Sequence, residues 1–368
     1  MHESGFGARL AEVARAATAI GVDAVLVTPG PDLHYLIGYE AIPLERLTCL
    51  VIPATGESSL VVPRLELLAA EASPARSLGL TMNPWGEVDD PYALVASLVP
   101  EAATVAVDNH MWAEKVLRLR DAMPSVRQVL AGEVISRLRM RKDDAEIAAL
   151  LRAGAAIDAV HAMVPKFLRA GRSERDVGAD ICAAIIEAGH ARVDFVIVAS
   201  GPNGASPHHE VSDRVIQAGD PVVIDIGGTM PDGYRSDCTR TYAVGTPSSQ
   251  FRAAYDTLQR AQAAAVAHAR AGVTCESVDD AARSVLHDAG IGSLFIHRTG
   301  HGIGLETHEE PYIVAGNTLS LEPGMAFSIE PGFYREGVHG ARIEDIVIAT
   351  DEGVIVANNL PRELVVVP

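Results

Sequence analysis

The hydrophobic and polar positions of the first third of the chain predict a small α/β domain. Apolar residues recur at helical spacing over residues 8–20, and a short apolar run follows at residues 23–28. The turn sequence Pro29-Gly30-Pro31 precedes a predicted helix that ends at Gly38. Short predicted strands, with the sequences LTCLVI, SSLVVP and TVAVD, then alternate with helices. We find no cluster of candidate ligands in this part of the sequence.

The rest of the chain predicts one structural unit that occurs twice. The first copy has helices at 145–170 and 174–189, a strand at 193–199, and a strand pair at 221–229 and 234–244. The second copy has helices at 250–271 and 276–289, a Gly/His-rich stretch at 297–308, and a strand pair at 325–330 and 341–349. A basic segment precedes the first long helix, which Asp143 or Asp144 can cap. We therefore predict an α/β (α+β) fold with two domains, residues 1–135 and 136–368.

Composition limits the binding partners and the cellular compartment that we expect for this protein. The 368 residues are 48% hydrophobic and carry a formal net charge of −18, which opposes binding to nucleic acid or to an anionic membrane. Four cysteines without a C-x-x-C pair predict neither a disulfide framework nor a zinc ribbon. The N-terminus lacks the pattern of a signal peptide, and no apolar stretch approaches the roughly 18 residues of a membrane span. We expect a cytoplasmic protein.

Each predicted hairpin carries an acidic residue on both strands. Asp225 and Asp237 are centred on position 231, and Glu330 and Glu344 on Gly337. If the members of each pair lie nearly opposite one another, their Cβ atoms are about 4.5–5.5 Å apart. Both pairs follow or flank apolar runs, and burial of such carboxylates costs several kcal/mol without a compensating cation. One of them alone is as readily a turn acid, but two mirrored pairs favour a divalent metal ion.

Histidines gather in two segments that are rich in turn residues. His297, His301 and His308 lie in HRTGHGIGLETHEEP, where glycine lets the backbone approach a ligand, and His208 and His209 lie in GPNGASPHHE. Histidine is a common metal ligand and a proton carrier near neutral pH. Competing signatures are absent from the sequence: H-E-x-x-H, the phosphate-binding G-x-x-x-x-G-K, the G-x-S-x-G elbow and the dinucleotide fingerprint.

These segments carry a resemblance to a known superfamily. Residues 145–350 resemble the metallopeptidases of the creatinase/methionine aminopeptidase ("pita-bread") superfamily, with DIGG, GYRSDCTRTY, TGHGIGLETHEEP, SIEPG and RIEDIVI in the same order. The N-terminal sequence GVDAVLVTPGPDLHYLIGY is similar to the accessory domain of the proline-specific branch, which contains Xaa-Pro dipeptidases (prolidases) and Xaa-Pro aminopeptidases. The resemblance implies a small creatinase-like domain followed by a pita-bread catalytic domain with pseudo-twofold duplicated helix-helix-hairpin units.

The resemblance also implies roles for individual residues. It implies two divalent ions, with Asp237 and Glu344 as bridging ligands and a full ligand set of Asp225, Asp237, His301, Glu330 and Glu344. Mn²⁺ is the expected metal, and Co²⁺ and Zn²⁺ are alternatives. A hydroxide that bridges the two ions would attack the carbonyl before proline. His208 and His308 would hydrogen-bond that carbonyl, and Glu330 would also carry the proton. His297 would line the substrate site, and Arg342 would hold the carboxylates beside it.

We expect an Xaa-Pro dipeptidase that acts on small peptides with proline at the second position, as a homodimer. The alternative is an aminopeptidase P-like enzyme for longer peptides. The intact ligand set disfavours both a metal-free creatinase-like hydrolase and a non-catalytic pita-bread binding protein, and the extra N-terminal domain disfavours a methionine aminopeptidase. Two features depart from the family pattern. Asp237 follows Asp225 by one residue more than expected, and Tyr312 stands where some prolidases have an arginine that grips the carboxylate of a dipeptide.

Overall fold

The computed structural model describes residues 3–368 and divides into two compact units, Met1–Arg139 and Met140–Pro368. The boundary between them lies within a helix near the predicted one at residue 135. The elements of the N-terminal unit are α1 (Glu3–Ala19), β1 (Ala24–Val27), α2 (Pro31–Ile37), β2 (Cys49–Pro53), β3 (Ser59–Pro63), α3 (Leu67–Ala72), η1 (Pro74–Leu78), β4 (Thr81–Trp85), α4 (Pro91–Leu98), β5 (Thr104–Val107), α5 (Ala113–Ala122), β6 (Arg127–Leu130) and α6 (Gly132–Met140).

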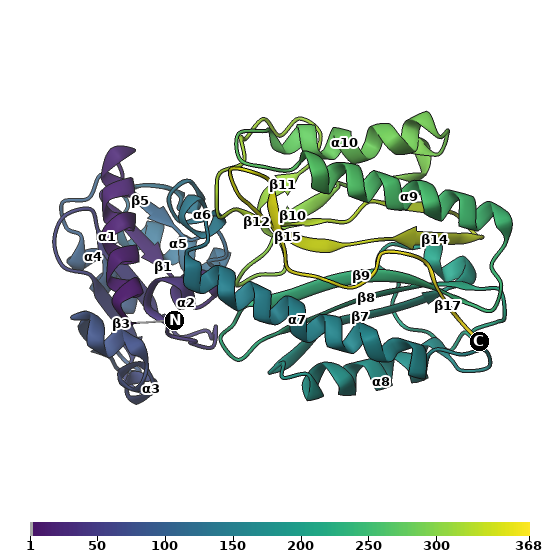
Figure 1. Ribbon diagram of the computed structural model, residues 1–368. Coiled ribbons are helices and arrows are strands. Elements are labelled where there is room, and N and C mark those ends of the chain that lie inside the picture. Colours follow the sequence, from purple (N-terminus) through teal and green to yellow (C-terminus); the bar gives the residue numbers. More distant parts are fainter. Residues whose placement is uncertain (1–2) are drawn as a thin grey trace. The chain divides into compact units, whose positions relative to one another are not determined.

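The N-terminal unit is an α/β domain around one mixed sheet. Its strand order is β4-β3-β2-β1-β5-β6, in which β1 pairs antiparallel with β2 and parallel with β5. Helix α1 begins at Glu3, before the predicted start at residue 8. The prediction missed its first turns because Gly5 and Gly7 are unfavourable inside a helix. The predicted alternation of short strands and helices is confirmed (Figure 1).

The second unit contains the duplicated arrangement. Its elements are α7 (Asp144–Phe167), α8 (Glu174–Glu187), β7 (Arg192–Ser200), η2 (Gly201–Ala205), β8 (Pro221–Thr229), β9 (Arg235–Val244), α9 (Ser249–His268), α10 (Cys275–Asp288), η3 (Gly292–Leu294), β10 (Gly300–Gly302), β11 (Glu309–Ile313), β12 (Ala326–Ile329), β13 (Gly332–Arg335), β14 (His339–Arg342), β15 (Asp345–Ala349), β16 (Val354–Val356) and β17 (Val365–Val367). Side-chain caps fix several helix starts: Asp143 and Glu146 form a reciprocal capping box at α7, and Ser173, Ser248 and Thr274 cap α8, α9 and α10.

Two layers of strands are sandwiched between two pairs of helices. Figure 1 shows α7 and α8 along one side of the β7–β8–β9 layer, and α9 and α10 on the opposite side of this unit, with α9 next to β14. One sheet has the order β17-β9-β8-β7, and the other has β11-β10-β12-β15-β16. Each helix pair buries its own apolar core: Ile157, Val177 and Ile224 belong to the first, and Phe251 and Phe327 to the second. The predicted pita-bread architecture with duplicated units is confirmed.

The register of the first hairpin differs from the prediction. Asp225 pairs with Thr239 and Asp237 pairs with Gly227, so the two aspartates are diagonal neighbours on one face rather than directly opposite. The hairpin is centred on Asp232 because its loop ends with Gly233 in the left-handed conformation, at φ 87°. The expectation of a directly opposed pair centred on residue 231 was wrong.

The second hairpin has the predicted centre but is interrupted. Ile329 pairs with Asp345, and Gly332 pairs with Arg342, so both ladders are centred on Gly337. The predicted strand 341–349 is divided into β14 and β15, and Glu344 lies at the break. The chain therefore leaves one sheet and enters another at the residue that carries the carboxylate.

Helix α7 corrects the expectation that no stretch is long and apolar enough for a membrane span. By length and composition alone α7 meets that description, with a mean hydropathy of 1.5 over its most apolar window. Ile157, Val160 and Val164 on this helix are fully buried in the core that it shares with α8, β8 and β9. The helix therefore has the character of a core helix of this unit.

Candidate metal centre

Five strands or strand ends bring the predicted ligands to one place. Asp225 lies on β8, Asp237 on β9 and His301 on β10. Glu330 directly follows β12, and Glu344 directly precedes β15. One possible ligand atom from each of Asp237, His301 and Glu344 lies within 4.8 Å of the others, and all three side chains are buried. The His301 Nε2 atom lies 3.1 Å from Glu330 Oε1 and 3.7 Å from Asp237 Oδ2.

Glycines on both sides of His301 allow its strand to pass between two others. A Cβ atom at Gly300 would lie 1.8 Å from the carbonyl oxygen of Ser328, and one at Gly302 would lie 2.2 Å from that of Glu310. Any side chain at either position would clash with the backbone of a neighbouring strand. Ser328 then fixes the local geometry, since its Oγ accepts from the His301 backbone N–H and donates to Glu330 Oε1. The sequence GHG is therefore a steric requirement of this site.

The tautomer of His301 favours a cation at the centre. Its Nδ1 atom lies 3.1 Å from the carbonyl oxygen of Gly302, an acceptor, so Nδ1 carries the proton. In the neutral ring the lone pair of Nε2 then faces the carboxylates of Asp237 and Glu330. An imidazole nitrogen and two carboxylates that converge in this way form a donor set that suits a divalent cation.

The carboxylates show the same deficit of positive charge. Burial, followed by the charges of Asp225 and Glu330, raises the pKa of Asp237 well above its ordinary value. Burial and the charge of Asp237 likewise raise the pKa of Glu344. Asp225 Oδ1 and Glu344 Oε1 are buried and have no hydrogen-bond partner within the described part of the chain. Buried, unpaired carboxylate oxygens beside an imidazole lone pair fit divalent cations with oxygen and nitrogen ligands.

A polar chain holds the Asp225 side of the site. Arg342 Nη2 donates to Asp225 Oδ2 at 2.5 Å, and Arg342 Nη1 donates to the hydroxyl oxygen of Tyr334 at 2.7 Å. His297 completes the chain: its Nδ1–H donates to the Arg298 carbonyl, so its Nε2 accepts from the Tyr334 hydroxyl at 2.8 Å. His297 lines the cavity as predicted, but both of its ring nitrogens are bonded to protein groups. Arg342 was predicted to hold the carboxylates of the site, and it contacts one of them, Asp225.

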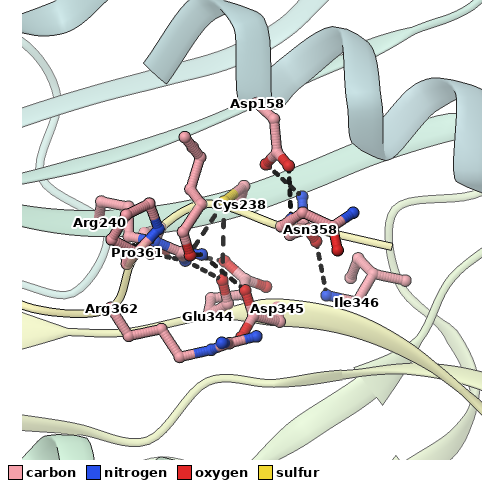
Figure 2. Close-up of polar contacts among 12 residues, drawn as sticks. Asp158, Cys238, Arg240, Glu344, Asp345, Ile346, Asn358, Pro361 and Arg362 are labelled. Atoms are coloured by element: carbon pink, nitrogen blue, oxygen red, sulfur yellow. Dashed lines mark hydrogen bonds and ion pairs between the residues drawn. The ribbon is translucent and has the colours of Figure 1, made fainter. Parts of the chain in front are cut away.

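Glu344 is fixed by a buried network on the side away from the cavity. Its Oε2 accepts from the Thr239 hydroxyl, and its backbone carbonyl accepts from Arg240 Nη1 at 2.6 Å. Arg240 Nη2 also donates to Asp345 Oδ1 at 2.7 Å, and Arg362 donates to the other oxygen of Asp345 (Figure 2). Figure 2 shows Pro361 and Asn358 of the C-terminal segment beside this network, and the Pro361 carbonyl accepts from Arg240 Nε. An ion pair and several carbonyl contacts thus set the position of the break between β14 and β15.

A buried glutamate anchors the loop that carries His208. Glu174 accepts hydrogen bonds from the backbone and side chain of Ser200, from Asn203, from the backbone and side chain of Ser212, and from His209 Nε2 at 2.8 Å. Burial alone would raise the pKa of Glu174, but the bonds from Ser200 and Ser212 outweigh it and lower that pKa. His208 itself is exposed at the cavity. The bond between His209 and Glu174 therefore helps to fix the loop that carries the predicted catalytic residue His208.

The site opens into a cavity of about 930 Å³, within the range of small-molecule sites. His308 lies on its wall, with its ring centroid 4.1 Å from that of His301. Burial, followed by the electrostatic effects of the neighbouring His301 and Arg298 side chains, lowers the pKa of His308 to about 4. Apolar side chains also line the cavity, including Phe195, Ile197 and Ile296. All nine predicted site residues are brought to this cavity: Asp225, Asp237, His301, Glu330, Glu344, His208, His308, His297 and Arg342.

The sequence reasoning missed the residues that position the ligands. Tyr334, Thr239, Glu174 and the Arg240–Asp345 pair are buried and polar, but none belongs to a cluster of ligand types in the sequence. The one available signal was an acidic residue in an otherwise apolar strand, as at Asp345 in β15.

Comparison with protein families decides the class of this site. The model of metallopeptidase family M24 matches residues 148–351, and that of the creatinase/prolidase N-terminal domain matches residues 9–141. This chain belongs to metallopeptidase family M24. As an M24 metallopeptidase it is a hydrolase, and its family uses divalent metal ions, in agreement with the donor set described above.

Relatives of this M24 metallopeptidase are similar along their whole length. The probable dipeptidase PepE of Mycobacterium tuberculosis is 56% identical over 364 residues, which cover 99% of this chain and 97% of the relative. The Xaa-Pro dipeptidase of Lactobacillus helveticus is 36% identical and is matched over 91% of this chain and 92% of its own length. The crystal structure of dipeptidase PepE from Mycobacterium ulcerans has a TM-score of 0.97 at 55% identity, with 100% of this chain and 99% of that chain covered.

Proposed function

We propose that this M24 metallopeptidase hydrolyses the Xaa-Pro bond of dipeptides with the help of two divalent cations. The observation that supports this proposal is the cluster of Asp237, His301 and Glu344. In it an imidazole nitrogen and buried carboxylate oxygens converge, and Glu344 Oε1 has no hydrogen-bond partner among the described residues. The Xaa-Pro dipeptidase of Lactobacillus helveticus supports the choice of substrate, because it is 36% identical over most of both chains.

The proposed ligand set consists of Asp225, Asp237, His301, Glu330 and Glu344. Asp237 and Glu344 would be shared by the two ions, because both are buried and the charges of Asp225 and Glu330 act on each of them. When bound, two such cations lower the pKa of a water molecule and polarise the scissile carbonyl. We expect Mn²⁺, with Co²⁺ or Zn²⁺ as alternatives, since carboxylates and one imidazole suit all three.

The remaining residues orient the substrate and move the proton. His208 and His308 lie on different loops of the same cavity, and we expect their N–H groups to donate to the scissile carbonyl oxygen as negative charge develops there. The carboxylate of Glu330 is proposed to take a proton from the attacking water and to deliver it to the leaving proline nitrogen. Arg342 and Tyr334 keep Asp225 in place.

A cleavage panel tests this proposal. Ala-Pro, Ala-Ala and Ala-Pro-Ala are compared with the metal-free protein and with protein reloaded with Mn²⁺, Co²⁺ or Zn²⁺. We expect hydrolysis of Ala-Pro only after metal is restored, and little hydrolysis of Ala-Ala. Preference for Ala-Pro-Ala over Ala-Pro would favour the alternative, an Xaa-Pro aminopeptidase for longer peptides. Location in the cytoplasm and assembly as a homodimer stay predictions.

A further inference from the structure

One arginine of the active-site cavity differs from its neighbours in how its charge is balanced. Arg298 is half-buried and lines the cavity, and no aspartate or glutamate among residues 3–368 forms an ion pair with its guanidinium group. Other arginines close to the site are neutralised: Arg342 pairs with Asp225, Arg235 with Asp194, and Arg283 with Asp279. The charge of Arg298 is therefore available to a ligand in the cavity.

Tyr312 holds this guanidinium group in place. The Cζ atom of Arg298 lies 4.3 Å from the centroid of the Tyr312 ring, a cation–π contact. Tyr312 on β11 pairs directly with His301 on β10. Because opposed residues of antiparallel strands project to the same face, the Tyr312 ring lies on the face that carries the metal-ligating histidine. The guanidinium group is thus held beside the site of reaction.

The backbone around Arg298 is also fixed. Its carbonyl oxygen accepts from His297 Nδ1 at 2.7 Å, and the next N–H, of Thr299, donates to the buried carboxylate of Asp279 at 3.0 Å. A side chain on a fixed backbone that rests on an aromatic ring loses little conformational entropy on binding. The guanidinium group of Arg298 is consequently pre-organised to bind an anionic group.

We propose that Arg298, supported by Tyr312, binds a carboxylate of the peptide substrate and so determines which peptides are preferred. The inference rests on the proposed peptidase function. A planar guanidinium group can donate two parallel hydrogen bonds to a carboxylate. In Xaa-Pro the terminal carboxylate is attached to the proline Cα, next to the scissile bond, whatever the first residue is. We therefore expect the terminal carboxylate, and a side-chain carboxylate of the first residue is the second source of the same chemistry.

Four substrates distinguish the two sources. The kcat/KM values are measured for Ala-Pro, Ala-Pro-amide, Glu-Pro-amide and Gln-Pro-amide. The wild-type protein is compared with Arg298→Ala, Arg298→Lys, Tyr312→Leu and Tyr312→Phe, and bound metal is measured for each. Arg270→Ala is the matched control, since Arg270 is exposed and forms no side-chain ion pair within the described residues.

We expect the wild type to prefer Ala-Pro over its amide by about 10- to 150-fold, the contribution of a charge-assisted hydrogen bond. Arg298→Ala should abolish this ratio without loss of metal or of amide hydrolysis. Arg298→Lys should keep part of it, Tyr312→Leu should reduce it, and Tyr312→Phe should leave it intact because the ring remains. Loss of the Glu-Pro-amide over Gln-Pro-amide preference instead assigns Arg298 to the side-chain carboxylate.

Unchanged ratios in Arg298→Ala, or an equal loss on all four substrates, would overturn the inference while leaving the proposed function intact. A wild type that cleaves none of the four substrates after metal loading would refute the proposed function and this inference together.

Discussion

The buried pair of Arg240 and Asp345 allows a quantitative test of what holds Glu344 in place. The two side chains are 4% and 0% exposed, and Arg240 also donates to the Glu344 carbonyl oxygen. In Asp345→Asn the carboxylate becomes a neutral amide, and the buried guanidinium group loses its closest negative partner. Removal of one partner from a buried pair costs about 3–5 kcal/mol. We expect the lower end, about 3 kcal/mol, because asparagine retains one acceptor oxygen.

The chain offers a matched control on its surface. Arg141 and Glu322 form an ion pair at 2.9 Å in the same unit, but their side chains are 54% and 48% exposed. Because water and salt screen such a pair, Glu322→Gln should cost about 0–1 kcal/mol. The two substitutions make the same change of carboxylate to amide, so the difference between them reports burial.

The free energy of unfolding of both metal-free variants is measured by urea denaturation followed by circular dichroism. Metal affinity is then measured by competition with a chelator. Asp345→Asn should also weaken metal binding, because Glu344 is held through the same network. Equal stability losses in the two variants, or full metal affinity in Asp345→Asn, would refute the claim that the network positions Glu344.

Three further predictions address other parts of the site. His208→Ala and His308→Ala should each keep the bound metal and lose about 10²- to 10³-fold in kcat, and loss of metal from either would make that histidine a ligand. Glu174→Gln should displace the loop and lower kcat/KM by about 10²-fold, with metal content unchanged. The control Asp213→Asn, in an exposed ion pair on the same loop, should have no effect. Identical activities of the two variants would contradict the anchoring role of Glu174. Burial, followed by the charge of Arg240, lowers the pKa of His161 from 6.5 to about 3. As pH drops, the unfolded chain therefore binds this proton before the folded chain does. The free energy of unfolding should fall between pH 6.5 and about pH 3, by up to roughly 5 kcal/mol. Urea unfolding at several pH values checks this, and an unchanged slope in His161→Gln would assign it to other groups.

The positions of helices and strands were predictable where local signals agreed. Apolar periodicity located both helix pairs, and the capping box of Asp143 and Glu146 marks the start of α7 in the sequence itself. The mirrored acids were also visible, since each stands beside an apolar run in a predicted hairpin. The centre of the second hairpin was correct because its turn is symmetric about Gly337.

Other features depended on turn geometry and on distant contacts. The first hairpin was displaced because Gly233, as the last loop residue, takes the left-handed conformation, and sequence spacing alone does not show which loop residue does so. The interactions of Tyr334, Arg342 and His297 join residues from three segments, so no local pattern reveals them. The apolar character of α7 was underestimated because Arg152 and Asp158 interrupt it in the sequence.

The central claim is that two divalent cations held by Asp225, Asp237, His301, Glu330 and Glu344 support Xaa-Pro hydrolysis. The most direct measurement removes metal with a chelator and restores Mn²⁺ stepwise, while bound metal per chain and the rate of Ala-Pro hydrolysis are recorded together. We predict no hydrolysis without metal and a maximal rate at two bound ions per chain. Full activity of the stripped protein, or a maximal rate at one bound ion, would contradict the claim.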